Sequence, residues 1–269
     1  MELPGHLSPT QINMLTKCPM QWYLRYVEGI KVPPGIALIL GKSFHEAKAM
    51  NGEQKVESHA DLPANDVVEY FADQYDKNIA LGMIWSPEEI ERGREIVKGE
   101  GKDNGCAITE LYMNDLSPIT QPIRVEIEMN IKFIGDDVPE IKCILDEISH
   151  EVADPDKHEC IRETKTAGKS PNQGTADTSL QITSYNIAFQ QTYKKPPKLY
   201  YDALVKTKKP KIVTIPTTRS EDQTRQFLER VQACFDLIKN DVFMPAPTDS
   251  WWCTSKFCGY YGDACKFTR

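Results

Sequence analysis

Apolar residues recur every three or four positions in the first part of the chain. The pattern starts after Ser8 and Pro9, which suit an N-cap and a first helical position, and it continues through Ile12 and Leu15. A proline–glycine break at residues 33–35 interrupts it. Further helices are predicted from about residue 41, over residues 66–99, over residues 179–192 and over residues 222–239.

Between the helical stretches the pattern changes to strands. Residues 123–133 alternate between apolar and polar side chains, which predicts a strand with one buried face. Shorter apolar stretches predict four more strands, over residues 141–148, 159–165, 198–206 and 211–215. The second and third strands adjoin in sequence, which indicates a hairpin. We therefore expect an α/β fold with a mixed sheet flanked by helices, rather than a doubly wound parallel sheet.

The composition is that of a globular protein. The chain has 269 residues, of which 40% are hydrophobic and 26% charged. No apolar run approaches the roughly 18 residues that a membrane span needs, and the start of the chain lacks the basic and apolar regions of a secretory signal. We therefore expect no membrane association and a cytoplasmic location.

The net charge of −7 does not by itself indicate a nucleic-acid-binding protein. Charge can be local, however, and lysines gather between residues 194 and 211. A solvated lysine-rich turn and a surface that contacts DNA both fit this stretch. Its members are Lys194, Lys195, Lys198, Lys206, Lys208, Lys209 and Lys211.

Two carboxylates and one lysine fall on the second and third predicted strands. Asp146 follows the apolar pair Ile144-Leu145, and Glu163 and Lys165 are two residues apart on the next strand. Residues i and i+2 of a strand point to the same face, so Glu163 and Lys165 project side by side. If the two strands pair, Asp146 can join them.

This grouping suits hydrolysis of a phosphodiester. Carboxylate oxygens bind Mg²⁺ or Mn²⁺, which polarise a phosphate and acidify water. The ammonium of Lys165 can orient or deprotonate the attacking water and balance developing charge. A salt-bridge ladder on the surface explains the same three residues without catalysis.

Three further polar residues lie on predicted helices. Gln181 and Tyr185 are four residues apart and share one helix face, and His45 lies on an early helix after Gly41. Each alone also suits an ordinary surface or structural position.

In order along the chain, these residues resemble the RecB-like branch of the PD-(D/E)XK nucleases, which includes CRISPR-associated adaptation nucleases and phage exonucleases. The resemblance extends from Ser8 to Cys265. Its motifs are Cys18-Pro19 followed by Trp22, Tyr23 and Tyr26; Gly41-Lys42-Ser43-Phe44-His45; Ile144-Leu145-Asp146; Glu163-Thr164-Lys165; Gln181-Ile182-Thr183-Ser184-Tyr185; and a cysteine-containing tail.

The resemblance implies a role for each matching residue. The implied metal ligands are His45, Asp146, Glu163 and the carbonyl of Thr164. Lys165 is implied as the catalytic lysine, and Gln181 and Tyr185 as residues that support the site or contact the DNA backbone. Glu126, on the strand before Asp146, is a candidate further acid.

One position departs from the family pattern. The family usually has a glycine three residues before the metal-binding aspartate, and this chain has Cys143 there. The departure concerns the local backbone and leaves Asp146 itself in place.

Eight cysteines are many for a cytoplasmic chain, where disulfides are disfavoured. Cys253, Cys258 and Cys265 lie close together near the end, without the tight C-x2-C pair of most zinc sites. Cys18 supplies a fourth thiolate if the first helix packs against the tail. Four thiolates suit a zinc ion or a [4Fe–4S] cluster.

The resemblance, with one early cysteine and three late ones, favours the [4Fe–4S] cluster. Such a cluster would restrain both ends of the chain and hold the first helix in place. The aromatic residues of the tail, Trp251, Trp252, Tyr260 and Tyr261, would shield the cluster or stack on bases.

We therefore expect a single nuclease domain over residues 1–269, with a nuclease core at about 41–240 and a cluster module at about 8–30 plus 245–269. Its expected activity is Mg²⁺- or Mn²⁺-dependent exonuclease cleavage of single-stranded DNA or duplex ends. A bacterial, archaeal or phage-infected cell is the expected setting, in recombination, repair, phage replication or CRISPR-type processing.

Two alternatives to this expectation stay open. One is a catalytically silent DNA-binding module with a structural metal cluster. The other is a zinc-stabilised protein whose carboxylates form only salt bridges. No G-x-x-x-x-G-K-[ST] phosphate loop is present, so ATP-driven unwinding would need a helicase partner; recombination or CRISPR proteins are the other expected partners.

Overall fold

The computed structural model describes residues 5–133 and 138–268. Contacts between Cα atoms divide the chain into two compact units. Unit 1 comprises residues 1–33, 130–143 and 220–269, and unit 2 comprises residues 34–129 and 144–219. None of the described helices is long and apolar enough to cross a membrane.

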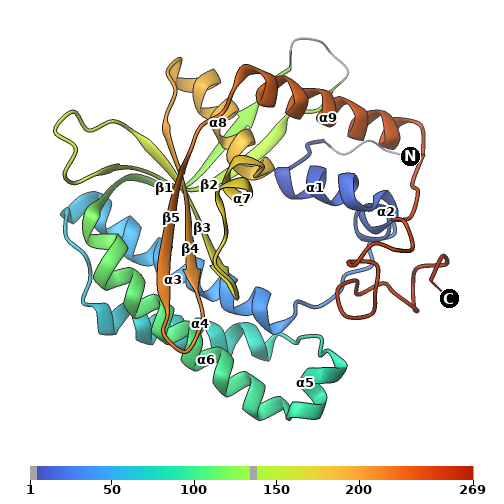
Figure 1. The fold of residues 1–269 in the computed structure, drawn as a ribbon, viewed down its shortest axis with the longest axis horizontal. Helices are drawn as coiled ribbons and strands as arrows, with labels where there is room; N and C mark the ends of the chain where they lie inside the picture. Colours follow the sequence, from blue (N-terminus) through green and yellow to red (C-terminus); the bar gives the residue numbers. More distant parts are fainter. Residues whose placement is uncertain (1–4, 134–137, 269) are drawn as a thin grey trace. The chain divides into compact units, whose positions relative to one another are not determined.

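Five strands form one sheet in the order β1-β2-β3-β4-β5 (Figure 1). Their bounds are β1 Thr120–Ile131, β2 Ile141–Glu151, β3 Cys160–Ala167, β4 Lys198–Val205 and β5 Lys211–Thr217. The β2–β3 and β4–β5 pairs are antiparallel, whereas β3 and β4 are parallel. A crossover that contains α8 (Leu180–Tyr193) joins the parallel pair, as strands of the same direction require. The predictions of a mixed sheet and of a β2–β3 hairpin are confirmed.

Three helices of unit 2 pack on one another and on part of the sheet. They are α3 (Ile36–Ser58), α4 (Ala64–Ala80) and α6 (Arg94–Leu111) (Figure 1). Phe44, Phe71 and Ile108, one from each helix, are fully buried in a common core with Leu204 of β4. A Cβ atom at Gly105 would lie 1.9 Å from the ring of Phe71, so α4 and α6 can approach this closely only with glycine there.

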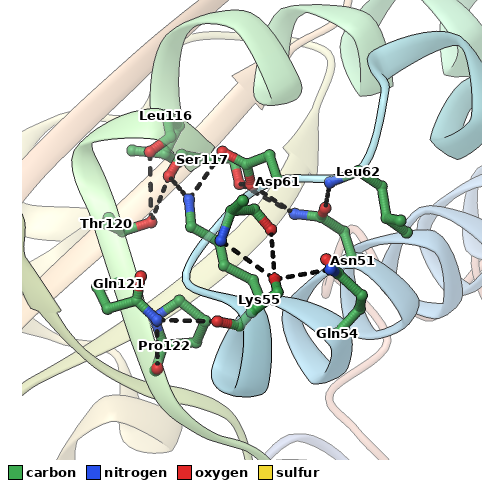
Figure 2. A network of polar contacts seen from close by, with 12 residues as sticks. Asn51, Gln54, Lys55, Asp61, Leu62, Leu116, Ser117, Thr120, Gln121 and Pro122 are labelled. Atoms are coloured by element: carbon green, nitrogen blue, oxygen red, sulfur yellow. Dashed lines mark hydrogen bonds and ion pairs between the residues drawn. The ribbon is translucent and has the colours of Figure 1, made fainter.

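A buried lysine near the end of α3 stabilises the turn that follows the helix (Figure 2). Lys55 Nζ lies 2.7 Å from Asp61 Oδ2 and donates a hydrogen bond of 2.7 Å to the carbonyl of Ser117. Asn51 and Ser117 donate to the other oxygen of Asp61. The buried charges are therefore paired and hydrogen-bonded, as burial requires.

Unit 1 contains α1 (Pro9–Lys17), α2 (Pro19–Tyr26) and α9 (Glu221–Lys239). The first predicted helix begins as expected, with Ser8 accepting a hydrogen bond from Gln11 N. It ends at Lys17, and a second helix begins at Pro19. Proline disfavours helical backbone in the residue before it, and Cys18 is accordingly extended, with φ of −160°.

Other helix boundaries also differ from the prediction. The helix predicted from Gly41 begins five residues earlier, at Ile36, after Gly35. The region predicted as helical over residues 66–99 contains α4, α5 (Pro87–Arg92) and α6, and α6 continues to Leu111. Short helices at α7 (Gln173–Asp177), η1 (Tyr112–Leu116) and η2 (Ser117–Ile119) were not predicted, because segments this short carry little periodic signal.

Candidate active site

Alternation along two neighbouring strands places the predicted acidic residues on one face of the sheet. Ile148 of β2 pairs with Ile161 of β3. Asp146 lies two residues before Ile148, and Glu163 two residues after Ile161, so both share the face of that pair. Lys165 follows on the same face of β3.

Lys165 and Glu163 form an ion pair. The Glu163 side chain is fully buried, whereas that of Lys165 is 39% exposed. Burial by itself would lower the pKa of Lys165, but the charges of Glu163 and Asp146 raise it above its usual value. Lys165 is therefore positively charged, and its side chain is partly accessible to a ligand.

Helix α8 supports this lysine through a chain of hydrogen bonds. Lys165 Nζ donates to Gln181 Oε1 at 2.9 Å, and Gln181 Nε2 donates to the Tyr185 hydroxyl at 2.5 Å. The Tyr185 hydroxyl donates in turn to the carbonyl of Ile144 on β2 at 2.6 Å. Gln181 and Tyr185 thus connect β3 to β2 beside Asp146.

His45 reaches the same place from α3. Its Nδ1 atom lies 3.3 Å from Asp146 Oδ2, and it hydrogen-bonds to the backbone of Thr164. Burial lowers the pKa of His45 despite the opposing charge of Asp146. The imidazole is therefore neutral at pH 7, the form in which histidine binds metals.

The electrostatics of the site are those of crowded, buried carboxylates. Burial first, and the charge of Asp146 second, raise the pKa of Glu163 to about 7. Three carboxylate oxygens, Asp146 Oδ2 and both of Glu163, are buried, and among the described residues Lys165 and His45 are the charged or ring nitrogens that pair with them. Carboxylate oxygens are the preferred ligands of hard divalent cations, so the chemistry of these residues fits a metal site.

Glu163→Gln is expected to stabilise the metal-free protein at pH 8. The carboxyl keeps its proton more strongly in the folded state, so ionisation of Glu163 lowers the stability as the pH rises from about 4.5 to about 7. The variant should therefore gain on the order of 2 kcal/mol at pH 8 and little at pH 4.5. Thermal unfolding in EDTA measures this difference.

Glu57→Gln is a suitable control, because Glu57 is exposed on α3. It should change the melting temperature little at either pH. Equal melting temperatures of the wild type and Glu163→Gln at pH 8 would contradict the proposed burial of an ionised carboxylate.

One buried lysine next to the site was not predicted. Lys48 Nζ donates to Thr164 Oγ1 at 3.1 Å and lies 3.4 Å from Glu147 Oε2. Burial opposes its charge, but Glu147 above all raises the pKa of Lys48 well above its usual range. Nothing in the sequence marked Lys48 as buried, although it lies one helical turn after His45 and Glu147 adjoins Asp146.

Glu126 lies on β1 with a left-handed backbone, at φ of 49°. It lines a cavity of about 470 Å³ together with His45 and Glu53. Burial and the charge of Asp146 raise the pKa of Glu126. Glu126 is therefore close to the site, and left-handed backbone in a residue other than glycine is often found at functional sites.

Among the described residues, Asp154, Asp156 and His158 form the one group of three whose ligand atoms all lie within 4.8 Å. Asp154 already accepts hydrogen bonds from the backbone of Asp156 and His158 and from Lys198 Nζ. Its interactions are those of a turn with a surface ion pair. The ligand atoms of His45, Asp146 and Glu163 are spaced more widely than in that group.

The lysine-rich stretch is partly neutralised. Lys195 pairs with Glu159 and Lys198 with Asp154. Such exposed pairs are typical of a solvated surface.

Within unit 1, the four predicted cysteine ligands gather around the start of α2. Cys18, Cys253 and Cys258 line one cavity of about 250 Å³. Cys265 is buried in an apolar cluster that also includes Cys18 and Cys258. Burial raises the pKa of Cys258, and the charges of the other three thiols raise it further.

Two nitrogen donors lie at the cysteine cavity. Ala246 N donates to Cys18 Sγ at 3.3 Å. Trp252, which lines the cavity, has a buried Nε1 without a hydrogen-bond partner among the described residues. Several thiols gathered around one cavity fit a positively charged, thiolate-binding centre.

Comparisons with known proteins found one similar family and similar solved structures. The model of the PD-(D/E)XK nuclease superfamily matches residues 6–266. The structure resembles a crystal structure described as "Putative exonuclease" from Eubacterium rectale, with a TM-score of 0.49 and 14% sequence identity over 95% of this chain and 93% of that one. A comparison with curated proteins found no match.

Proposed function

Because this chain belongs to the PD-(D/E)XK nuclease superfamily, we propose that it is a metal-dependent deoxyribonuclease that removes nucleotides from DNA ends. The carrying observation is a set of buried carboxylate oxygens on Asp146 and Glu163, beside the ammonium of Lys165 and the imidazole of His45. Membership of the superfamily supports nuclease activity in general. The exonuclease mode, the metal and the assignment of residues are our proposal.

In this proposal, His45, Asp146, Glu163 and the carbonyl of Thr164 hold Mg²⁺ or Mn²⁺. When bound, the metal supplies charge that polarises the scissile phosphate and acidifies the attacking water. The neutral His45 adds a nitrogen ligand, and the two carboxylates add hard oxygen ligands.

Lys165 has a different role from these ligands. Its raised pKa makes it a hydrogen-bond donor rather than a base at pH 7. It therefore orients the attacking water and balances negative charge that develops on the phosphate. Gln181 and Tyr185 fix the lysine against α8 and leave its outer side accessible.

We propose further that Cys18, Cys253, Cys258 and Cys265 bind a [4Fe–4S] cluster in unit 1. A single zinc ion needs sulfur atoms roughly 3.8 Å apart, from Zn–S bonds of about 2.3 Å in a tetrahedron. The cavity of about 250 Å³ that Cys18, Cys253 and Cys258 line has room for the wider spacing of a [4Fe–4S] cluster.

The proposed mode of cleavage can be tested with two DNA topologies. Linear DNA labelled at the 5′ or the 3′ end should be degraded in Mg²⁺ or Mn²⁺, and the label that is released first gives the polarity. Covalently closed circular DNA of the same sequence should persist. Cleavage of the circle at the same rate would contradict the exonuclease mode, and cleavage of neither substrate would favour a DNA-binding module.

A further inference from the structure

Lys48 is a buried charge to which the proposed mechanism assigns no function. Its side chain is 6% exposed and that of its partner Glu147 is 5% exposed. The ammonium lies 3.4 Å from Glu147 Oε2 on β2 and donates a hydrogen bond of 3.1 Å to Thr164 Oγ1 on β3. One side chain of α3 therefore joins two strands of the sheet.

Each contact of Lys48 adjoins a proposed metal ligand. Glu147 follows Asp146 along β2, and Thr164 follows Glu163 along β3. His45 lies three residues before Lys48, which is one turn earlier on the same helix. A displacement of Lys48 would therefore shift α3, β2 and β3, the three segments that carry the proposed ligands.

Few residue pairs join β2 to β3, although β3 is paired with β4 along its length. The register between β2 and β3 covers Ile148 with Ile161 and Ser149 with Cys160. Asp146 and Glu163 lie beyond these pairs, towards the end where Lys48 bridges the strands. The lysine thus connects β2 and β3 beyond the last residue pair of their register.

We propose that Lys48 is a positioning residue that sets the spacing of Asp146 and Glu163 for the divalent cation. This inference rests on the proposed function. Lys48 itself does not bind the metal, because a cation would repel its ammonium. It acts through Glu147 and Thr164 by holding α3, β2 and β3 in one arrangement.

The test uses Mn²⁺ affinity in the absence of DNA, measured from the electron paramagnetic resonance signal of free Mn²⁺. Lys48→Met alone would leave Glu147 buried and unpaired, which can prevent folding. The principal variant is therefore the double substitution Lys48→Met with Glu147→Gln, which removes both charges and leaves the local net charge unchanged. We expect its Kd for Mn²⁺ to rise at least about 10-fold, as for other residues that orient metal ligands.

Lys55→Met with Asp61→Asn is the matched control. This pair also joins α3 to a neighbouring segment through a buried lysine, but it contacts none of the proposed ligands (Figure 2). It should lower the melting temperature and leave the Mn²⁺ affinity unchanged. A purely structural role for Lys48 would give the same pattern in both double variants.

The outcomes separate this inference from the proposed function. Equal or tighter Mn²⁺ binding by the Lys48→Met, Glu147→Gln variant would overturn the positioning role, since the wild type would still bind the metal and cleave DNA. An absence of Mn²⁺ binding and cleavage in the wild type would instead overturn the proposed function. Lys48→Arg, which keeps the charge, should retain an affinity between those of the wild type and the double variant.

Discussion

Lys165→Ala is expected to reduce DNA cleavage at least about 100-fold, the usual loss when one group that stabilises transition-state charge is removed. The ammonium is paired with Glu163 and fixed by Gln181, so no other described donor in this network can replace it. DNA binding and metal binding should change little, because the carboxylates remain. Single-turnover cleavage and a filter-binding assay at saturating metal measure the two properties separately.

Lys169→Ala is the control for this variant. Lys169 is exposed and lies just beyond the end of β3. The Lys169→Ala substitution therefore removes one positive charge four residues from Lys165. Its cleavage rate should stay within a few-fold of the wild type. A Lys165→Ala protein that cleaves as fast as Lys169→Ala would remove the lysine from the mechanism.

Cys258→Ser is expected to cause the second large effect, which is loss of the metal centre and unfolding of unit 1. Cys258 lines the same cavity as Cys18 and packs in the same apolar cluster as Cys265. Anaerobically purified wild type should be brown, with broad absorption near roughly 400 nm and close to four iron atoms per chain, from the chemistry of a [4Fe–4S] cluster. The variant should be colourless, and its unit 1 should be cleaved readily by protease.

Cys106→Ser is the control, because Cys106 belongs to unit 2 and is not one of the four proposed ligands. This protein should keep its colour, iron content and protease resistance. If the wild type contains zinc instead of iron, the four cysteines bind a zinc ion and the proposed [4Fe–4S] cluster is wrong. Normal iron content in Cys258→Ser would mean that the ligand set is wrong.

The sequence predicted the sheet and the acidic face well, for identifiable reasons. Alternation fixes which strand residues share a face, so Glu163 and Lys165 had to project together. The adjoining strands that carry Asp146 and Glu163 could form only a short connection, which favours an antiparallel hairpin. Motif order then placed His45, Gln181 and Tyr185, whose contacts with this face the structure now describes.

Other features depend on contacts that sequence patterns do not encode. A lysine on a helix is usually exposed, and only the packing of α3 against β2 and β3 explains why Lys48 is buried. The early start of α3 arises because residues 36–40 are apolar and are followed by further helical residues, although Gly41 suggested a boundary. The break between α1 and α2 at Cys18 follows from Pro19, which disfavours helical backbone in the residue before it. The helical periodicity of the apolar residues continues across this break, so the sequence pattern did not predict it.

The most direct test of the central claim is cleavage of linear DNA by the wild type and by Asp146→Ala, with Mg²⁺, with Mn²⁺ and with EDTA. Asp146 is near both His45 and Glu163, so its removal should eliminate the metal site with little change in the fold. We expect degradation by the wild type only when a divalent metal is present, and none by the variant. Cleavage in EDTA, or undiminished cleavage by Asp146→Ala, would contradict a metal-dependent nuclease site at these residues.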